Sequence, residues 1–193
     1  FMCGIAGLIH KGKSVNIGSE LQSMLQALKH RGPDSTGYAL YADNDGQNFI
    51  MRFKVGENVG EGSSSVNEDS SVYDSRKKLV DNKLSELGAT IVKEERLTPY
   101  SFRYEIKYDK DLMEFSKKIE SVEMVEILSL GKSLELIKDL GDATAVSERY
   151  ELNKVKGTHG IGHARMATES GVDIKSAHPF WGYPFEDVSV VHN

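Results

Sequence analysis

Apolar residues recur along this chain with the spacings of both strands and helices. The first run, Cys3 to Ile9, is short and nearly continuous, as in a strand buried on both faces. From Ser19 onward the spacing becomes helical, and Gly32-Pro33 ends the pattern; its apolar members are Leu21, Met24, Leu25 and Leu28. Ser19 and Gln22 have the spacing of a capping box, so the sequence predicts a helix that begins near Ser19.

Two runs of strand-forming residues follow, at 37–41 and 49–55. The segment Asp43-Asn-Asp-Gly46 between them has the composition of a tight turn, which predicts that the two strands pair as a hairpin. Residues 60–75 are small, polar and acidic, with too little apolar surface to offset the entropy of an ordered chain. We therefore interpret 60–75 as a flexible linker or mobile loop.

Beyond the linker, helical and strand-like patterns alternate. We expect helices at 76–87, 111–120 and 142–150, and strands at 89–95, 101–108 and 122–130. The alternation predicts a small α/β insertion at 76–150. Residues 1–59 and 151–193 would then form the main domain on either side of it.

Composition limits the function without identifying it. With 193 residues the chain can bury a real core, and 39% hydrophobic and 27% charged residues are typical of a soluble globular protein. The net charge of −5 and the lack of a dense basic run argue against nucleic acid as a partner. Every uncharged apolar stretch is far shorter than the roughly 20 residues that cross a bilayer, so we expect a cytoplasmic protein without a membrane partner.

Polar side chains crowd a glycine-rich frame between Gly157 and Asn193. Taken singly, Arg165 could form a surface ion pair, Asn193 could be a turn residue, and His178 could be a hydrogen-bonded core imidazole. The glycines of 157–162 alone do not predict a phosphate loop, because no lysine completes the motif. A cluster of such groups on this frame instead indicates a site for a small polar ligand.

The histidines of this segment are also candidate metal ligands. His159 and His163 are four residues apart, a spacing that brings two metal ligands together only on a helix. Glycines at 157, 160 and 162 make a helix improbable there, and a Glu or Cys ligand at suitable spacing is absent from the sequence. We therefore predict no metal and favour structural histidines.

Cys3 is the strongest candidate for chemistry. A thiol attacks as the thiolate, and a cysteine with a free α-amine has a base with an unperturbed pKa of about 7.7 to 8.0 in the same residue. Met2 precedes a small residue, as in chains from which the initiator methionine is removed, so we expect the mature chain to begin at Cys3. Phe1 does not fit this expectation, because together with Met2 it would lock the amine in a peptide bond.

Three separated blocks of the sequence resemble the class II glutamine amidotransferase domain, an N-terminal-nucleophile hydrolase. The blocks are Met2-Cys-Gly-Ile-Ala-Gly7, His30-Arg-Gly-Pro-Asp-Ser-Thr-Gly37, and Gly162-His-Ala-Arg-Met-Ala-Thr168 with Ala177-His-Pro-Phe180 and Val190-Val-His-Asn193. Their order and spacing make the resemblance specific. The last block is most similar to stand-alone subunits related to glutamate synthase and N-methylglutamate synthase.

The resemblance implies a fold and a set of roles. The family fold is α+β, a four-layer αββα sandwich, which we expect to be incomplete at the C-terminus of this chain. Cys3 would attack the side-chain amide carbon of glutamine, Arg165 would bind the substrate's α-carboxylate, and Asn193 would stabilise the oxyanion. The remaining residues that the resemblance assigns would shape and support the pocket: Arg31, Gly32, Asp34, Ala167, Thr168 and His178.

This chain also departs from the family pattern. Family members continue past Asn193 with a glycine that completes the oxyanion hole and with an acidic residue that binds the α-amine of the substrate. Ala164 replaces a common threonine. The resemblance implies L-glutamine as substrate and a glutamate synthase-like partner that receives ammonia. This domain would need no cofactor, whereas the partner would carry FMN and an iron–sulfur cluster. The alternative is a non-catalytic regulatory or assembly module that keeps the fold.

Overall fold

The computed structural model describes residues 3–28, 33–56, 69–166 and 174–192, with no side-chain description for 33, 34 and 166. The strands are β1 Gly4–Ile9, β2 Pro33–Ala42, β3 Phe49–Lys54, β4 Thr90–Thr98, β5 Ser101–Lys107, β6 Glu126–Gly131, β7 Leu134–Leu140, β8 Gly157–Met166, β9 Phe180–Trp181 and β10 Ser189–Val190. The helices are α1 Ile17–Ala27, α2 Ser70–Leu87, α3 Leu112–Ile119 and α4 Ala143–Arg149, with short 3-10 turns η1 Leu152–Lys154 and η2 Ile174–Ser176.

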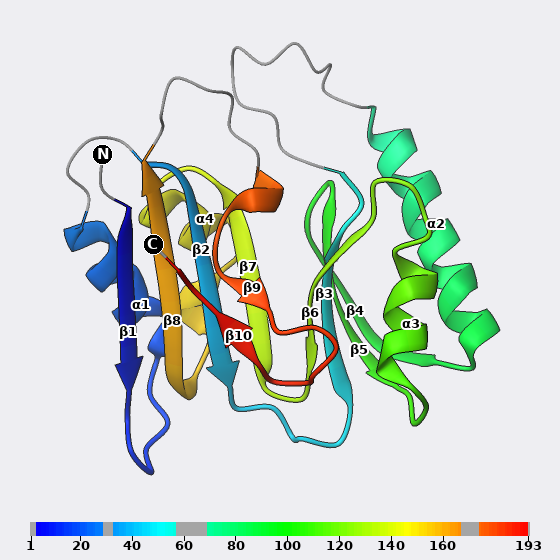
Figure 1. The fold of residues 1–193 in the computed structure, drawn as a ribbon, viewed down its shortest axis with the longest axis horizontal. Coiled ribbons are helices and arrows are strands. Elements are labelled where there is room, and N and C mark those ends of the chain that lie inside the picture. Colours follow the sequence, from blue (N-terminus) through cyan, green and yellow to red (C-terminus); the bar gives the residue numbers. More distant parts are fainter. Residues whose placement is uncertain (1–2, 29–32, 57–68, 167–173, 193) are drawn as a thin grey trace.

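Two four-stranded antiparallel sheets form the centre of the protein (Figure 1). Sheet A has the order β1-β8-β2-β7, and sheet B has the order β4-β5-β3-β6. Helices α1 and α4 cover one face of sheet A, α2 and α3 lie against sheet B, and the small β9–β10 sheet lies on the open side of sheet A. The predicted α+β class, with a helix layer for each of two sheets, is confirmed.

The expected domain boundaries do not follow these sheets. β3, from the first segment, pairs with β5 and β6, whereas β7, from the expected insertion 76–150, pairs with β2 in sheet A. The predicted hairpin between 37–41 and 49–55 is therefore wrong. β2 is buried on both faces from Ser35 to Leu40 and takes its two partners from β7 and β8, so the chain crosses to the other sheet after Ala42.

Side-chain caps set most helix starts. The Asn16 side chain, rather than Ser19, caps α1 by accepting from the backbone amide of Ser19 at 3.0 Å. Asp111 and Asp142 cap α3 and α4 close to the predicted starts. Asp69 caps α2, which therefore begins inside the expected linker 60–75; residues 60–68 of that linker lie outside the described part of the chain.

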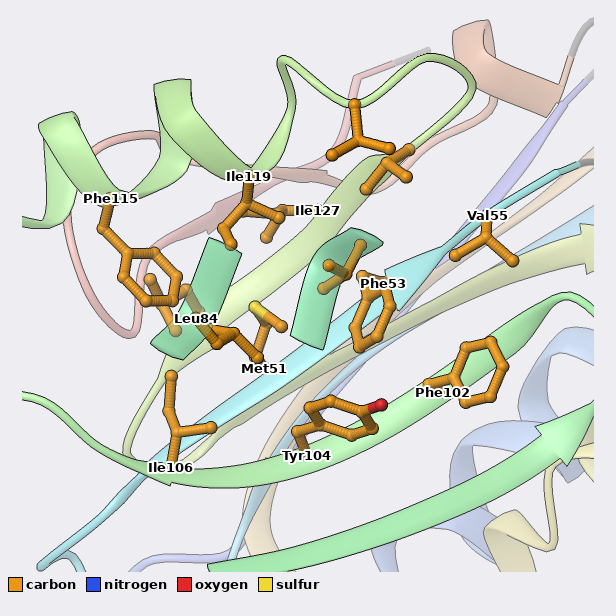
Figure 2. Close-up of a cluster of buried hydrophobic side chains, with 14 of the residues drawn as sticks. Met51, Phe53, Val55, Leu84, Phe102, Tyr104, Ile106, Phe115, Ile119 and Ile127 are labelled. Carbon is orange, nitrogen blue, oxygen red and sulfur yellow. The ribbon is translucent and has the colours of Figure 1, made fainter. Parts of the chain in front are cut away.

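Each sheet buries its own apolar cluster. Under sheet B, the side chains of β3 and β5 pack against α2 and α3, and Phe53 stacks on Phe102 and meets Tyr104 edge-on (Figure 2). Under sheet A, Leu21 and Leu25 of α1 pack against Tyr38 and Leu40. No helix within the described ranges is both long and apolar enough to cross a bilayer.

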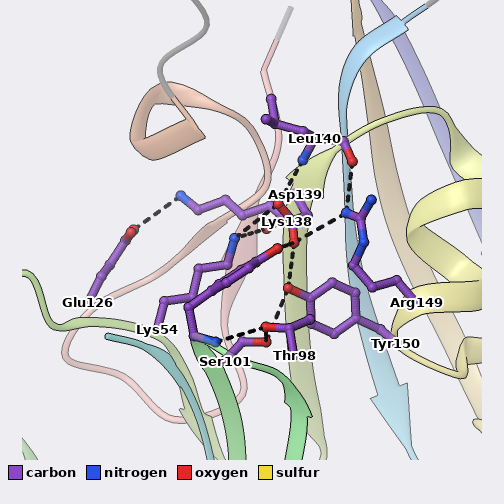
Figure 3. Close-up of polar contacts among 10 residues, drawn as sticks. Lys54, Thr98, Ser101, Glu126, Lys138, Asp139, Leu140, Arg149 and Tyr150 are labelled. Carbon is purple, nitrogen blue, oxygen red and sulfur yellow. Dashed lines mark hydrogen bonds and ion pairs between the residues drawn. The ribbon is translucent and has the colours of Figure 1, made fainter. Parts of the chain in front are cut away.

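Where the sheets adjoin, a small apolar cluster joins Leu128 of β6 to Ala39, Leu134 and Leu136 of sheet A, and buried ionic contacts also link the two sheets. We name the ionic contacts the inter-sheet ion network: Arg52, Lys54, Arg103, Glu135 and Asp139. Arg52 and Arg103 both bind Glu135, at 2.9 and 2.6 Å. Lys54 lies 3.6 Å from Asp139 (Figure 3). The tyrosine hydroxyls of Tyr100 and Tyr150 also donate to Asp139, at 2.7 and 2.6 Å. These buried carboxylates are fully partnered, and their cationic neighbours keep both pKa values below the usual range despite burial.

Candidate active site at one end of sheet A

Three segments far apart in the sequence meet at one end of sheet A. β1 begins there, β8 ends there, and β2 begins there (Figure 1). Gly4 pairs with Ala164, so Cys3 and Arg165, the next residues along the two strands, are opposite one another in the register. On the other side of β8, Arg165 pairs with Ser35 of β2. The antiparallel ladder therefore brings the described parts of the three sequence blocks side by side at Gly4, Ser35 and Arg165.

Strand alternation decides which side chains face the candidate site. Ala6 and Ala164 pack into the helix-covered core of sheet A. Their neighbours in the alternation, His163 and Arg165 on β8 and Ile5 on β1, point to the opposite, open face. Ile5 is 41% exposed, although it lies beside the buried His163. Continuing the same alternation, Cys3 lies on this open face with Arg165.

The segment Ile174–Phe180 crosses the open face of sheet A. Gly37 of β2 permits the crossing, because a Cβ atom at that position would lie 2.0 Å from the carbonyl oxygen of His178. The imidazole of His178 meets that of His163 edge-on at 5.1 Å between ring centroids. Two residues earlier in the segment, the Ser176 hydroxyl accepts a hydrogen bond from Nη1 of Arg165 at 3.0 Å. The segment thus places two polar side chains next to the end of β8.

Electrostatics at this end of the sheet favour an anionic ligand. Burial, with help from His178 and Arg165, lowers the pKa of His163 to about 4. Burial and the neighbouring His192, Lys138 and Arg165 also lower the pKa of His178. Both imidazoles are therefore neutral near pH 7, and Arg165 is the charged side chain that β8 presents here. A guanidinium held by a serine hydroxyl is well suited to bind a carboxylate.

The structure brings together Cys3, Arg165 and His178 of the predicted site residues. Asp34 lies in β2 beside this end, but its side chain is not described. Five predicted residues lie outside the described part of the chain: Arg31, Gly32, Ala167, Thr168 and Asn193. Sequence reasoning missed Ser176, and it gave His163 only a structural role. The alternation of His163 with Arg165 on a strand could have placed the histidine on the site face.

His159, the other histidine of the predicted β8 pair, lies toward the opposite end of the strand. Its ring stacks on Tyr41 at 4.1 Å, and its Nδ1 is 2.8 Å from the Thr158 hydroxyl. Across the ranges that the structure describes, no three His, Cys, Asp or Glu side chains are grouped so as to hold a metal ion. The glycine-rich segment is a strand, as its glycines predict, and not a helix.

A hollow of about 740 Å³ lies at the opposite end of sheet A from Cys3, beside Ala42 and Lys156. Its floor includes Arg52, Arg103 and Glu135 of the inter-sheet ion network. Both arginines are paired with Glu135, and Arg103 is also paired with Glu95, so these two cations are balanced by two carboxylates and leave little charge to bind a ligand. The hollow is therefore a weaker candidate for chemistry than the Cys3 end.

No family model matches the chain, but several known proteins are similar to it in sequence. It is 36% identical over 200 residues to a protein of Methanothermobacter thermautotrophicus named "Putative glutamine amidotransferase", covering 100% of this chain and 61% of that protein. It is 30% identical over 194 residues to the glutamine amidotransferase-like protein GlxB of Rhizobium meliloti, covering 100% of this chain and 58% of GlxB. A shorter stretch of 40 residues, 21% of this chain and 8% of the relative, is 52% identical to a glutamine-hydrolysing asparagine synthetase of Methanocaldococcus jannaschii, itself named as putative. The chain spans about three fifths of the length of the first two relatives.

Proposed function

Because the chain belongs to the class II glutamine amidotransferases, we propose that it hydrolyses L-glutamine to glutamate and ammonia at the Cys3 end of sheet A. One observation carries the proposal. The β1–β8 register sets Cys3 opposite Arg165, on the open face of the sheet. A nucleophile and a carboxylate-binding cation on adjacent strands match the two groups that glutamine presents, its side-chain amide and its α-carboxylate.

In this reaction the Cys3 thiol gives its proton to the α-amine of the same residue, and the sulfur attacks the amide carbon of glutamine. The C–N bond breaks, and the amine returns the proton to the leaving nitrogen, which departs as ammonia. Water then adds to the glutamyl thioester, releasing glutamate and restoring the thiol. The scheme requires that Phe1 and Met2 be absent from the active protein.

The other residues of the family site have supporting parts in this proposal. Arg165, oriented by Ser176, binds the α-carboxylate of glutamine. The Asn193 side-chain amide donates to the oxyanion of the tetrahedral intermediate, an interaction whose removal from such sites costs about 3 to 4 kcal/mol. The remaining residues would form the wall and support of the pocket: Arg31, Gly32, Asp34, Ala167, Thr168 and His178.

We further propose that the ammonia is delivered to a synthase partner, and that the protein acts in the cytoplasm. The resemblance to subunits related to glutamate synthase supports a glutamate synthase-like partner. FMN and an iron–sulfur cluster would then be bound by that partner and not by this domain. Co-purification of such a flavoprotein with the full-length protein is the direct test of the partner.

The test of the glutaminase activity combines three measurements. N-terminal sequencing and intact mass establish whether the purified protein begins at Cys3, and a coupled assay measures glutamate release from glutamine. The electrophilic glutamine analogue diazo-oxonorleucine should add one equivalent to Cys3. A protein that begins at Cys3 yet neither releases glutamate nor reacts with the analogue would instead be a non-catalytic module with the amidotransferase fold.

A further inference from the structure

Lys138 is an unusual residue to find inside sheet A. It lies in β7, only 2% exposed, and points to the open face of the sheet. The register pairs it with Gly37, and Gly37 in turn pairs with His163, so all three occupy one row across the strands. A lysine seldom tolerates such burial unless its charge is fully satisfied.

The ammonium group of Lys138 has three donors and three acceptors around it. It donates to the carbonyl oxygens of Lys175 and Ala177, at 3.2 and 3.3 Å. It also forms an ion pair with Glu126 at 3.3 Å (Figure 3). The ring of Phe180 lies 4.7 Å from the same nitrogen. Three of these four partners belong to the segment Ile174–Phe180 that crosses the candidate active site.

The two carbonyl groups flank Ser176, the residue that accepts the hydrogen bond from Arg165. Lys138 thereby fixes the backbone on both sides of Ser176. Sheet B holds Lys138 itself, because Nζ of Lys54 donates to the Lys138 carbonyl oxygen at 2.6 Å while pairing with Asp139. A continuous set of contacts therefore runs from the inter-sheet ion network through Lys138 and Ser176 to Arg165.

We propose that Lys138 is a positioning residue for the glutamine site: its buried ammonium holds the Ile174–Phe180 segment so that Ser176 orients Arg165 toward the substrate carboxylate. Only the kinetic consequence of this inference rests on the proposed function. The contacts by which Lys138 holds the Ile174–Phe180 segment, which we call the clamp, do not depend on it. Substrate binding depends on the Arg165 orientation, whereas Cys3 precedes β1, at the opposite edge of sheet A from Lys138 in β7. The clamp should therefore act on KM for glutamine and leave the chemical step nearly unchanged.

The experiment compares the full-length wild-type protein with Lys138→Met, which keeps the aliphatic stem and removes the ammonium group. Lys154→Met, an exposed lysine at the far end of sheet A, is the matched control. With active sites counted by diazo-oxonorleucine labelling, we expect KM for glutamine to rise about tenfold or more in Lys138→Met, with kcat within about threefold. Amide hydrogen exchange in 174–181 should accelerate about tenfold, while exchange in β8 stays unchanged.

The outcomes separate the clamp from the proposed function. If wild-type protein releases no glutamate, the glutaminase proposal fails, and hydrogen exchange alone decides whether Lys138 fixes the segment. Unchanged KM together with unchanged hydrogen exchange in Lys138→Met would overturn the clamp. A loss of activity that is explained entirely by fewer sites labelled with diazo-oxonorleucine would also overturn it. If Lys138→Met does not fold, Ser176→Ala tests the last link, since this exposed residue can lose its hydroxyl without disturbing the core; a wild-type KM there would refute the route through Arg165.

Discussion

The two sheets have the same number of strands and the same antiparallel pairing, yet they are built from different side chains. Sheet B buries large rings against its helices, with Phe53, Phe102 and Tyr104 in mutual contact. Sheet A is rich in glycine, and a Cβ atom at Gly162 would lie 2.6 Å from Leu25. Sheet B is thus stabilised by buried apolar surface area. In sheet A, glycines without side chains allow other parts of the chain to approach the strands closely around a polar face.

This difference predicts that stability and activity can be altered separately. Substitutions in the core of sheet B should lower the free energy of unfolding without changing the chemistry of the folded protein. Substitutions on the open face of sheet A should do the reverse. Four experiments test the separation, each on one side of the comparison.

Cys3→Ala should have the largest effect. Loss of the nucleophile removes the covalent pathway, so kcat for glutamine hydrolysis should fall by about 10⁴-fold or more. The melting temperature should change little, because Cys3 is only partly buried and the replacement is small. Glutamate release at the wild-type rate in this variant would mean that another group is the nucleophile.

Phe53→Ala tests the other sheet. Phe53 is fully buried and contacts the rings of Phe102 and Tyr104 at centroid distances of 5.3 and 4.9 Å. The cavity left by this truncation should lower the free energy of unfolding by about 3 to 5 kcal/mol, as measured by urea denaturation. At a temperature where the variant is folded, kcat/KM should match that of the wild type. A large loss of kcat/KM in folded protein would show that the two sheets are not separable.

Arg165→Ala returns to sheet A with a smaller expected effect. Removal of the guanidinium that binds the substrate carboxylate should lower kcat/KM about 100-fold, with most of the loss in KM. Arg96→Ala is the control, because Arg96 lies in sheet B and pairs with Asp74 on the surface. If both variants have wild-type kinetics, Arg165 does not bind the substrate.

How far the sequence predicts this fold depends on how local each feature is. Caps and periodicity located α3 and α4 closely, because Asp111 and Asp142 satisfy amides within their own first turns. β7 was missed altogether, since Glu135, Lys138 and Asp139 read as exposed charge when in fact each is buried with a partner. Strand pairing was also beyond local patterns, because a strand buried on both faces has no sequence feature that names its neighbours.

The sequence predicts which residues belong to the candidate site, but not the contacts that hold those residues in place. The motif blocks around Cys3, Arg165 and His178 predict that these residues belong together, and in the register Cys3, just before β1, lies opposite Arg165 of β8 at one end of the sheet. The contact of Lys138 with two backbone carbonyl groups could not be predicted, because any residue supplies a carbonyl group. Residue type therefore carried no information about that contact.

His163 provides the smallest and most specific test of the polar face. Its folded-state pKa of about 4 lies below the unfolded value of about 6.5, so the unfolded chain binds a proton first as the pH falls. The stability that the neutral imidazole contributes is complete above pH 6.5 and is lost between pH 6.5 and about 4. Relative to His163→Gln, the wild type should lose about 1 to 2 kcal/mol between pH 7 and pH 5, measured by urea denaturation at each pH. The lowered pKa of His178 causes a loss in the same window, but His178 is present in both proteins, so the comparison with His163→Gln isolates His163. The lowered pKa values of Glu135 and Asp139 make those carboxylates contribute only at lower pH. Equal losses of stability in the wild type and in His163→Gln would show that the His163 imidazole is solvated. The close packing of His178 over Gly37 would then not extend to His163.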